Sequence, residues 1–244
     1  QIMWATGPKQ YEIVKEKLEE NKISINNVEN AKIVPYMGTC LNYGSASNPR
    51  ELQNASTMKF VKKQYNSFTL ENEMKPDAIL GSSAKLISVA DAKKKGYYIP
   101  AGYTESTVPE LAFTTVDKSL EAAKNNGLKM RAHTLVWHSQ TPSWFFTKNY
   151  DGSKVVTPAV MDARLDFYIH NVMGHVMDKE KALTGSAGSI VYAWDVVNEY
   201  LHRPSFAFFK TWTSVYGDMG NSPSYVKKAF EIAYDMLKSY QATD

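Results

Sequence analysis

The strongest constraint on the fold of this chain is a regular alternation of strand-like and helix-like segments. Four apolar runs have the length and composition of buried strands, at residues 33–42, 66–72, 129–137 and 190–199. Each run is followed by a helical pattern. An alternation of this kind predicts a parallel sheet with right-handed crossovers.

The helical segments carry recognisable start and stop signals. Serine, threonine or asparagine followed by proline suits the beginning of a helix, and glycine suits its end. These signals stand at Asn48-Pro49 (a helix through about Gln64), Gly127, Thr157-Pro158 and Ser222-Pro223, and a further helix is expected around Tyr11, Val14 and Leu18.

Four strands leave two architectures open. One is an open four-stranded α/β sheet. The other is a (β/α)8 TIM barrel of which this chain supplies about the first four β/α units, since a closed barrel needs eight strands. In that case residues 1–244 form a single domain that is incomplete at the C-terminus, because a fifth strand would be due after Asp244.

Composition narrows the classes of partner. The net charge of +3 comes from dispersed lysines, so it does not predict nucleic-acid binding. No run approaches a membrane span, the first residues lack the parts of a signal peptide, and no glycine-rich loop suits a nucleotide. We expect no cofactor, no nucleic acid and no membrane. The single Cys40 excludes an intrachain disulfide, and we expect it to be a small buried residue.

Polar and aromatic side chains follow the ends of three predicted strands. Because the carboxyl ends of parallel strands meet at one edge, these side chains should converge there. The mixture of carboxylate, amide, ammonium, imidazole and indole groups suits a carbohydrate, since polar groups bind hydroxyls while an aromatic face packs against the sugar ring. The candidates are Glu71, Asn72, Lys75, His133, Trp137, Gln140, Asn198 and Glu199.

Three motifs carry a family resemblance. They are Phe68-Thr-Leu-Glu-Asn-Glu-Met-Lys75, Arg131-Ala-His-Thr-Leu-Val-Trp-His-Ser-Gln140 and Trp194-Asp-Val-Val-Asn-Glu199. In this order the chain resembles the N-terminal portion of glycoside hydrolase family ten, the endo-β-1,4-xylanases. The resemblance implies a (β/α)8 barrel that cleaves internal xylan linkages with retention of configuration, and a secreted or extracellular protein.

The resemblance also implies roles for the candidate residues. Glu199 resembles the general acid/base, and Asn198 resembles the partner of the sugar 2-hydroxyl. His133, Trp137 and Lys75 resemble residues that hold the sugar to be covalently attached. A further subsite is implied for Glu71 and Asn72, with Gln140 nearby.

Other notable residues are expected to have structural roles. Asp195, inside an apolar strand, needs partners and should support the site through a network rather than act directly. We expect Glu73 to be structural. His133 and His138 are five positions apart on a strand and its loop, which is a poor zinc spacing, so we expect no metal. Trp4, Trp144 and Trp212 are expected to pack.

The chain also departs from the family pattern. The stretch between Lys75 and His133 is longer than expected, and residues 81–110 are typical of a long loop on the active-site face that either walls the cleft or is a surface excursion. The segment Tyr200-Leu-His-Arg203 allows no assignment on the leaving-group side.

The nucleophile Glu of the family lies beyond the end of this sequence, so the two-carboxylate mechanism needs a second half-barrel, from a second chain or from the rest of a longer one. Three functions therefore stay open. The chain is an endo-xylanase or its acid/base-bearing half, a noncatalytic xylan-binding protein, or a half-barrel fragment that is inactive alone.

Overall fold

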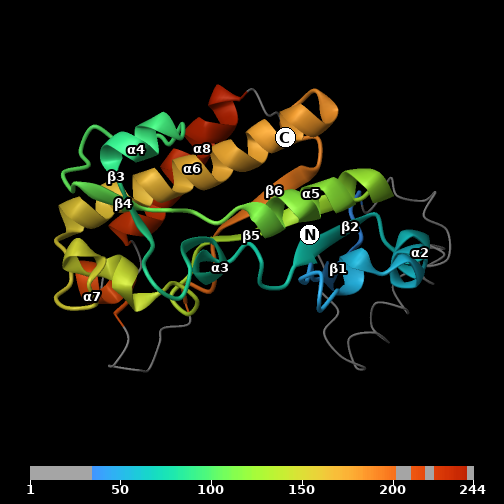
Figure 1. The fold of residues 1–244 in the computed structure, drawn as a ribbon, viewed down its shortest axis with the longest axis horizontal. Helices are drawn as coiled ribbons and strands as arrows, with labels where there is room; N and C mark the ends of the chain where they lie inside the picture. Colours follow the sequence, from blue (N-terminus) through green and yellow to red (C-terminus); the bar gives the residue numbers. More distant parts are fainter. Residues whose placement is uncertain (1–34, 202–209, 218–222, 241–244) are drawn as a thin grey trace.

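A parallel sheet forms the centre of the molecule. The computed structural model describes residues 35–201, 210–217 and 223–240 of the 244 (Figure 1). The strands β1 (Gly38–Leu41), β2 (Ser67–Leu70), β5 (Lys129–Val136) and β6 (Val191–Val197) lie side by side in chain order, and every neighbouring pair is parallel. Each strand falls within its predicted range, so the predicted parallel α/β architecture is confirmed.

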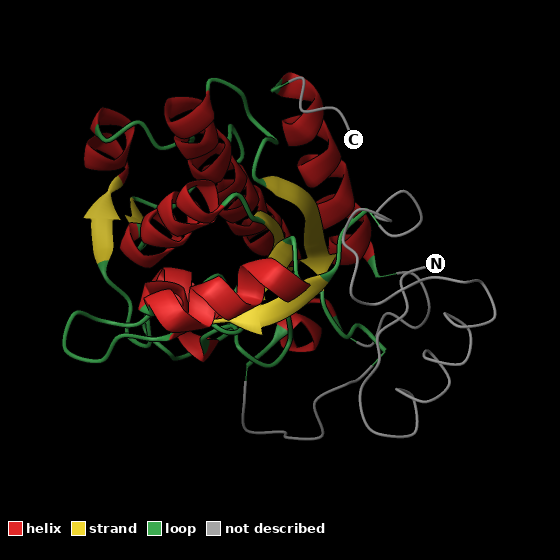
Figure 2. Cartoon of the chain, turned by 90° about the vertical axis from the view of Figure 1, so that its right-hand side faces the viewer, coloured by secondary structure: helices red, strands yellow, loops and turns green. Residues whose placement is uncertain are grey.

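Helices follow the strands along the chain. They are α2 (Ala55–Gln64), α3 (Pro76–Leu80), α5 (Thr114–Asn126), α6 (Pro158–Thr184), α7 (Trp212–Tyr216) and α8 (Ser224–Ser239), with short 3-10 turns η2 (Glu51–Gln53), η3 (Ser143–Phe146) and η4 (Lys148–Tyr150). Figure 1 shows α5, α6 and α8 next to one another along one face of the sheet, and Figure 2 shows the chain turned by 90° about the vertical axis.

Most of the predicted helix boundaries are confirmed. Gly127 ends α5 in the left-handed conformation with φ of 67°. Thr157 and Pro158 begin α6, and Pro223 precedes the first residue of α8. The predicted helix around Tyr11, Val14 and Leu18 lies outside the described residues, as does Trp4.

The predicted start at Asn48 is wrong. Asn54 adopts an extended conformation that separates η2 from α2, and its side-chain oxygen accepts a hydrogen bond from the Thr57 amide at 3.0 Å. The side chain of Asn54, rather than that of Asn48, therefore caps the helix, because a cap must lie outside the helical turn whose amide it satisfies.

The two faces of the sheet have different surroundings. Phe68, Leu70, Met130 and Ala132 are at most 1% exposed and pack beneath the helices. Residues that alternate with them point to the other face, which the described helices leave uncovered. Cys40 is on that face and is exposed, so its predicted burial is wrong. The strand pattern located Cys40 in a strand but did not reveal which face would be covered.

Residues 81–110 have secondary structure of their own. They contain β3 (Leu86–Ser88), which pairs antiparallel with β4 (Thr107–Pro109), and the helix α4 (Val89–Lys94) between them. Asn171 of α6 bonds both the amide and the carbonyl of Tyr98, at 2.8 and 2.9 Å. Figure 1 shows α4, β3 and β4 beside the first half of α6. We name residues 81–110 the insertion; these contacts attach it to α6.

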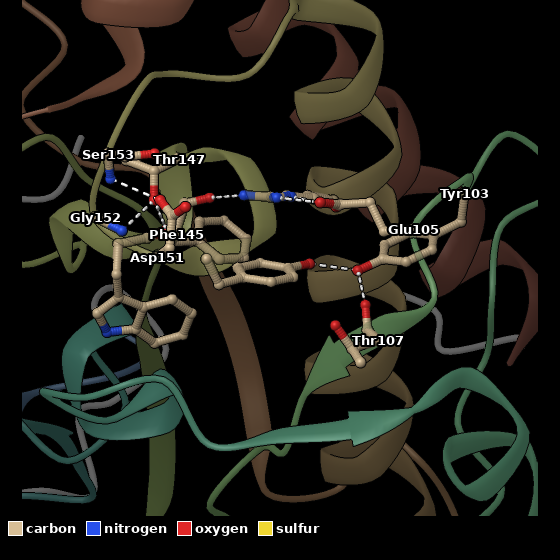
Figure 3. A network of polar contacts seen from close by, with 11 residues as sticks. Tyr103, Glu105, Thr107, Phe145, Thr147, Asp151, Gly152 and Ser153 are labelled. Carbon is tan, nitrogen blue, oxygen red and sulfur yellow. Dashed lines mark hydrogen bonds and ion pairs between the residues drawn. The ribbon is translucent and has the colours of Figure 1, made fainter.

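A polar network fastens the insertion to α6 (Figure 3). The fully buried Arg164 forms an ion pair with Glu105 of the insertion and donates to the carbonyl of Phe145 at 2.6 Å. Its guanidinium lies 3.7 Å from the ring centroid of Tyr150, whose hydroxyl bonds that of Tyr103. We call Tyr103, Glu105, Tyr150 and Arg164 the clasp. It joins three segments that are distant in sequence.

Candidate active site

The predicted site residues converge at the carboxyl ends of three strands. Glu71, Asn72 and Lys75 follow β2, and Trp137 and Gln140 follow β5. Asn198 and Glu199 follow β6, while His133 lies within β5. Hydrogen bonds and a cation–π contact connect most of them across the three strand ends, as predicted from their positions in the sequence.

Glu199 presents an exposed carboxylate beside an indole. The Nε1 of Trp137 donates a hydrogen bond to Oε2 of Glu199 at 3.0 Å. Glu199 has a φ of 49°, in the left-handed region that non-glycine residues seldom occupy. Backbone strain of this kind persists only where the surroundings impose it, and it is common at functional sites. The turn after β6 therefore fixes where this carboxylate points.

Lys75 links the first and second strand ends. Its side chain is largely buried, and Nζ donates to Oδ1 of Asn72 at 3.1 Å. The same ammonium lies 4.9 Å from the ring centroid of Trp137, a cation–π distance. Asn72, Lys75, Trp137 and Glu199 consequently form one continuous chain of contacts. That chain ends on an exposed carboxylate.

Gln140 closes a second connection between the same strand ends. Its Nε2 lies 3.5 Å from Oδ1 of Asn72 and donates to Oδ2 of Asp77 at 3.2 Å. The amide of Asp77 donates to the carbonyl of Gln140 at 2.8 Å. Asp77 has no predicted role, although it lies two positions after Lys75, where the motif ends.

Glu71 turns toward the first strand. Its Oε2 accepts a hydrogen bond from Nδ2 of Asn42 at 3.0 Å, and the same amide donates to Glu51 at 3.1 Å. Asn42 is buried, comes directly after β1 and was not among the predicted site residues. Its position at the end of the first predicted strand could have identified it, because the other site candidates were chosen from the ends of the three later strands.

Asp195 is the centre of a network on β5 and β6. Its carboxylate pairs with Arg131, whose Nε lies 2.8 Å away, and with Nδ1 of His133 at 2.9 Å. Burial alone would raise the pKa of Asp195, but the hydrogen bonds from His133 and Arg131 and their charges hold it below its ordinary value. The predicted supporting network around Asp195 is therefore confirmed.

The Asp195 contact also determines the form of His133. A carboxylate can only accept, so Nδ1 of His133 carries a proton and Nε2 is the acceptor in the neutral ring. In that tautomer, Nε2 is the nitrogen that can accept a hydrogen bond from a ligand hydroxyl. The peptide bond between His133 and Thr134 is cis.

Asn198 occupies the last paired position of the sheet. Its amide donates to the carbonyl of Val136 at 2.8 Å, and its side chain is half-buried. This pairing places Asn198 between the end of β5 and the turn that carries Glu199.

The residues predicted to be structural have structural contacts. Glu73 accepts hydrogen bonds from the amides of Tyr43 and Asn72, at 3.0 and 3.2 Å. Trp144 and Trp212 are buried, and Nε1 of Trp212 donates to the carbonyl of Trp137 at 3.2 Å. Within the described ranges no three His, Cys, Asp or Glu side chains are grouped to hold a metal ion.

The described helices also bear on membrane association. None of those in residues 35–201, 210–217 and 223–240, including the long α6, is apolar enough over a sufficient length to cross a bilayer.

A parallel sheet whose strand ends carry an aromatic and polar surface next to an exposed carboxylate is the arrangement that a (β/α)8 barrel uses for its site. The model of glycosyl hydrolase family 10 matches residues 25–241. The chain belongs to this family.

Named relatives agree with that assignment. Endo-1,4-beta-xylanase A of Butyrivibrio fibrisolvens is 45% identical over 232 residues, which cover 93% of this chain and 52% of that protein. Endo-1,4-beta-xylanase A of Thermotoga maritima is 34% identical, covering 78% of this chain and 14% of that protein. The chain thus spans about half the length of the first relative and less of the second.

Solved structures give the same result. The Clostridium thermocellum endo-1,4-beta-D-xylanase 10B, solved with xylohexaose, superposes with a TM-score of 0.59 and 28% identity, covering 82% of this chain and 35% of that one. An intracellular xylanase variant from Thermoanaerobacterium saccharolyticum, solved with xylotetraose, has a TM-score of 0.58 and 27% identity, covering 84% and 51%. The four-stranded sheet corresponds to part of their barrels.

Proposed function

We propose that this chain is the acid/base-bearing part of an endo-β-1,4-xylanase that hydrolyses internal xylan linkages with retention of configuration. The observation that carries the proposal is the exposed Glu199 carboxylate, hydrogen-bonded to Trp137 and connected through Lys75 to Asn72. An exposed carboxylate beside an aromatic ring supports a role in proton transfer next to a surface that suits a sugar.

Glu199 is the general acid/base of the proposed reaction. In the first step its carboxyl group protonates the leaving sugar oxygen while a second carboxylate attacks the anomeric carbon. In the second step Glu199 takes a proton from the water that releases the covalently held sugar. The second carboxylate is a Glu on a later strand of the complete barrel. Its source is the rest of a longer polypeptide or a second chain.

The remaining site residues hold the substrate. Trp137 supplies a ring face, and Lys75 and His133 supply donors and an acceptor around the sugar that becomes attached. Asn198, next to Glu199, bonds the 2-hydroxyl of that sugar. Glu71, Asn72 and Gln140 bind the next sugar on the same side.

Several findings support this assignment of substrate. The relatives named above are described as endo-1,4-β-xylanases, and two of the solved structures were determined with xylo-oligosaccharides. We also propose an extracellular location, because a polymeric substrate such as xylan is found outside the cell. One structural relative is described as intracellular, so the location needs a test of its own. The test compares the amount of this protein in the culture medium with the amount in the cell fraction.

The test of function uses xylan and xylohexaose. The chain, alone and then with the polypeptide that completes its barrel, is assayed for release of reducing ends and for binding. We expect hydrolysis by the completed barrel, with the β-anomer formed first, as NMR of the fresh products shows. Binding without any hydrolysis in either form would favour a noncatalytic xylan-binding protein, and neither binding nor hydrolysis would leave an inactive half-barrel fragment.

A further inference from the structure

Asp77 connects two segments that both carry site residues. It is in the first turn of α3, two positions after Lys75, and exchanges two hydrogen bonds with Gln140 of the loop after β5. One runs from its backbone amide to the Gln140 carbonyl at 2.8 Å, and the other from Nε2 of Gln140 to its carboxylate at 3.2 Å. Gln140 is therefore held by Asp77 through both its backbone carbonyl and its side-chain amide, which leaves its side chain little rotational freedom.

The contacts of Gln140 extend that connection to the sugar-binding surface. Its Nε2 also faces Oδ1 of Asn72 at 3.5 Å, and the same oxygen accepts from Lys75 at 3.1 Å. Lys75 lies over the Trp137 ring. Asp77 thus connects α3 to the loop after β5, and its carboxylate binds the same Gln140 amide that faces Asn72.

Asp77 and Gln140 are both half-buried, so the hydrogen bond between their side chains is partly shielded from water. Asp77 also lies near the buried Tyr168 of α6, where burial, followed by the negative charge of Asp77, raises the pKa of the Tyr168 phenol. A hydrogen bond in such a position has less competition from water than one at the exposed surface.

We infer that Asp77 is a positioning residue of the proposed xylan site: by fixing the side-chain amide of Gln140 it sets Asn72 and Lys75 relative to Trp137. This inference rests on the proposed function for its substrate. Asp77 itself acts through Gln140, so its effect falls on binding of the sugar and not on proton transfer by Glu199.

The test combines Asp77→Ala, Asp77→Asn, Gln140→Ala and the Asp77→Ala/Gln140→Ala double variant in the completed barrel. Loss of a hydrogen bond to a charged group predicts that Asp77→Ala raises KM and the Kd for xylohexaose about tenfold, with a much smaller change in kcat. Asp77→Asn keeps an acceptor and should restore most of the affinity. Once Gln140 is absent, Asp77→Ala should cause no further loss.

Asp117 offers a matched control. It also lies in the first turn of a helix and is half-buried. Its Oδ1 lies 2.7 Å from Nε2 of His175 on α6, and neither residue belongs to the site. We expect Asp117→Ala to leave KM unchanged. If it raises KM as Asp77→Ala does, or if the effects of Asp77→Ala and Gln140→Ala multiply, the inference is wrong.

A readout independent of catalysis separates this inference from the proposed function. The side-chain amide resonances of Gln140, assigned by their loss in Gln140→Ala, should move toward free-glutamine positions in Asp77→Ala and stay in place in Asp117→Ala. Unmoved resonances overturn the positioning role even where xylan is hydrolysed. Failure of the parent protein to bind or cleave xylan overturns the proposed function. The resonances still show in that case whether Asp77 fixes the side-chain amide of Gln140.

Discussion

Two arginine–carboxylate pairs in this molecule have the same charges but different surroundings. Arg164 and Glu105 of the clasp have side chains that are 0% and 17% exposed, and those of Arg131 and Asp195 in the site are 24% and 18% exposed. The clasp arginine also bonds a carbonyl and lies against an aromatic ring. The site pair shares its carboxylate with His133, which faces the uncovered side of the sheet.

The difference in burial gives the same kind of ion pair two roles, one in stability and one in orienting a site residue. A fully buried guanidinium must have all its partners, because losing one leaves an uncompensated charge away from water. The clasp therefore contributes to the stability of the folded chain. The site pair is partly solvated, so its removal costs less stability, and its main effect is the orientation of His133.

The largest expected effect separates chemistry from stability. Glu199→Gln should lower kcat/KM of the completed barrel by about 10²- to 10⁴-fold, the range that general acid–base catalysis contributes. Because Glu199 is exposed, the urea unfolding midpoint should change little. The pH–rate profile should also lose one limb. An active variant would show that Glu199 is not the acid/base.

The next effect falls on the clasp alone. Glu105→Ala leaves the buried Arg164 without its carboxylate and should lower the free energy of unfolding by about 3 kcal/mol, measured in urea. Activity per folded molecule should persist. Glu231→Ala, which removes the exposed partner of Lys227, is the control and should not shift the midpoint. Equal effects of the two variants would contradict the distinction.

The two regions should also differ at high pH. Burial raises the pKa of Tyr103 and of Tyr150 in the clasp. Both phenols stay protonated above about pH 10, where an unfolded tyrosine ionises, so this stability is present below that pH and is lost as the pH rises. The Tyr150→Phe variant should therefore lose less stability than the parent between about pH 9 and 11. Parallel curves would contradict this.

The smallest effect is expected at low pH and in the site. The pKa of Asp195 is depressed, so its contribution is present above the unfolded value of about 3.9 and is lost as the pH falls below it. Because burial opposes its hydrogen bonds, the net contribution is small. Asp195→Asn should reduce the loss of unfolding free energy on acidification, measured by urea unfolding followed by circular dichroism. An unchanged dependence on pH would contradict this.

The sequence predicted the parts of the molecule that local patterns encode. The run from Val191 to Val197 is a strand because it is apolar and β-branched, and Asn198 and Glu199 lie at its end because polar residues follow it. The convergence of three strand ends then followed from parallel topology alone. Gly127 and Pro158 marked helix boundaries for equally local reasons.

The parts that were missed depend on contacts between distant positions. Arg164 and Glu105 are 59 positions apart, and nothing in either segment indicates the other. The pairing of β3 with β4 was missed because two three-residue strands carry too little alternation to be recognised. The exposure of Cys40 depends on which face of the sheet the helices cover, which no single strand reveals.

The strand order of the main sheet has a consequence for synthesis. Because β1, β2, β5 and β6 are added at one edge in the order of the chain, each emerging strand finds its partner already made. None of these four described strands has to insert between two others of the four. The sheet can therefore grow on the ribosome one strand and helix at a time, and folding intermediates should shorten from the C-terminal side as translation is halted earlier.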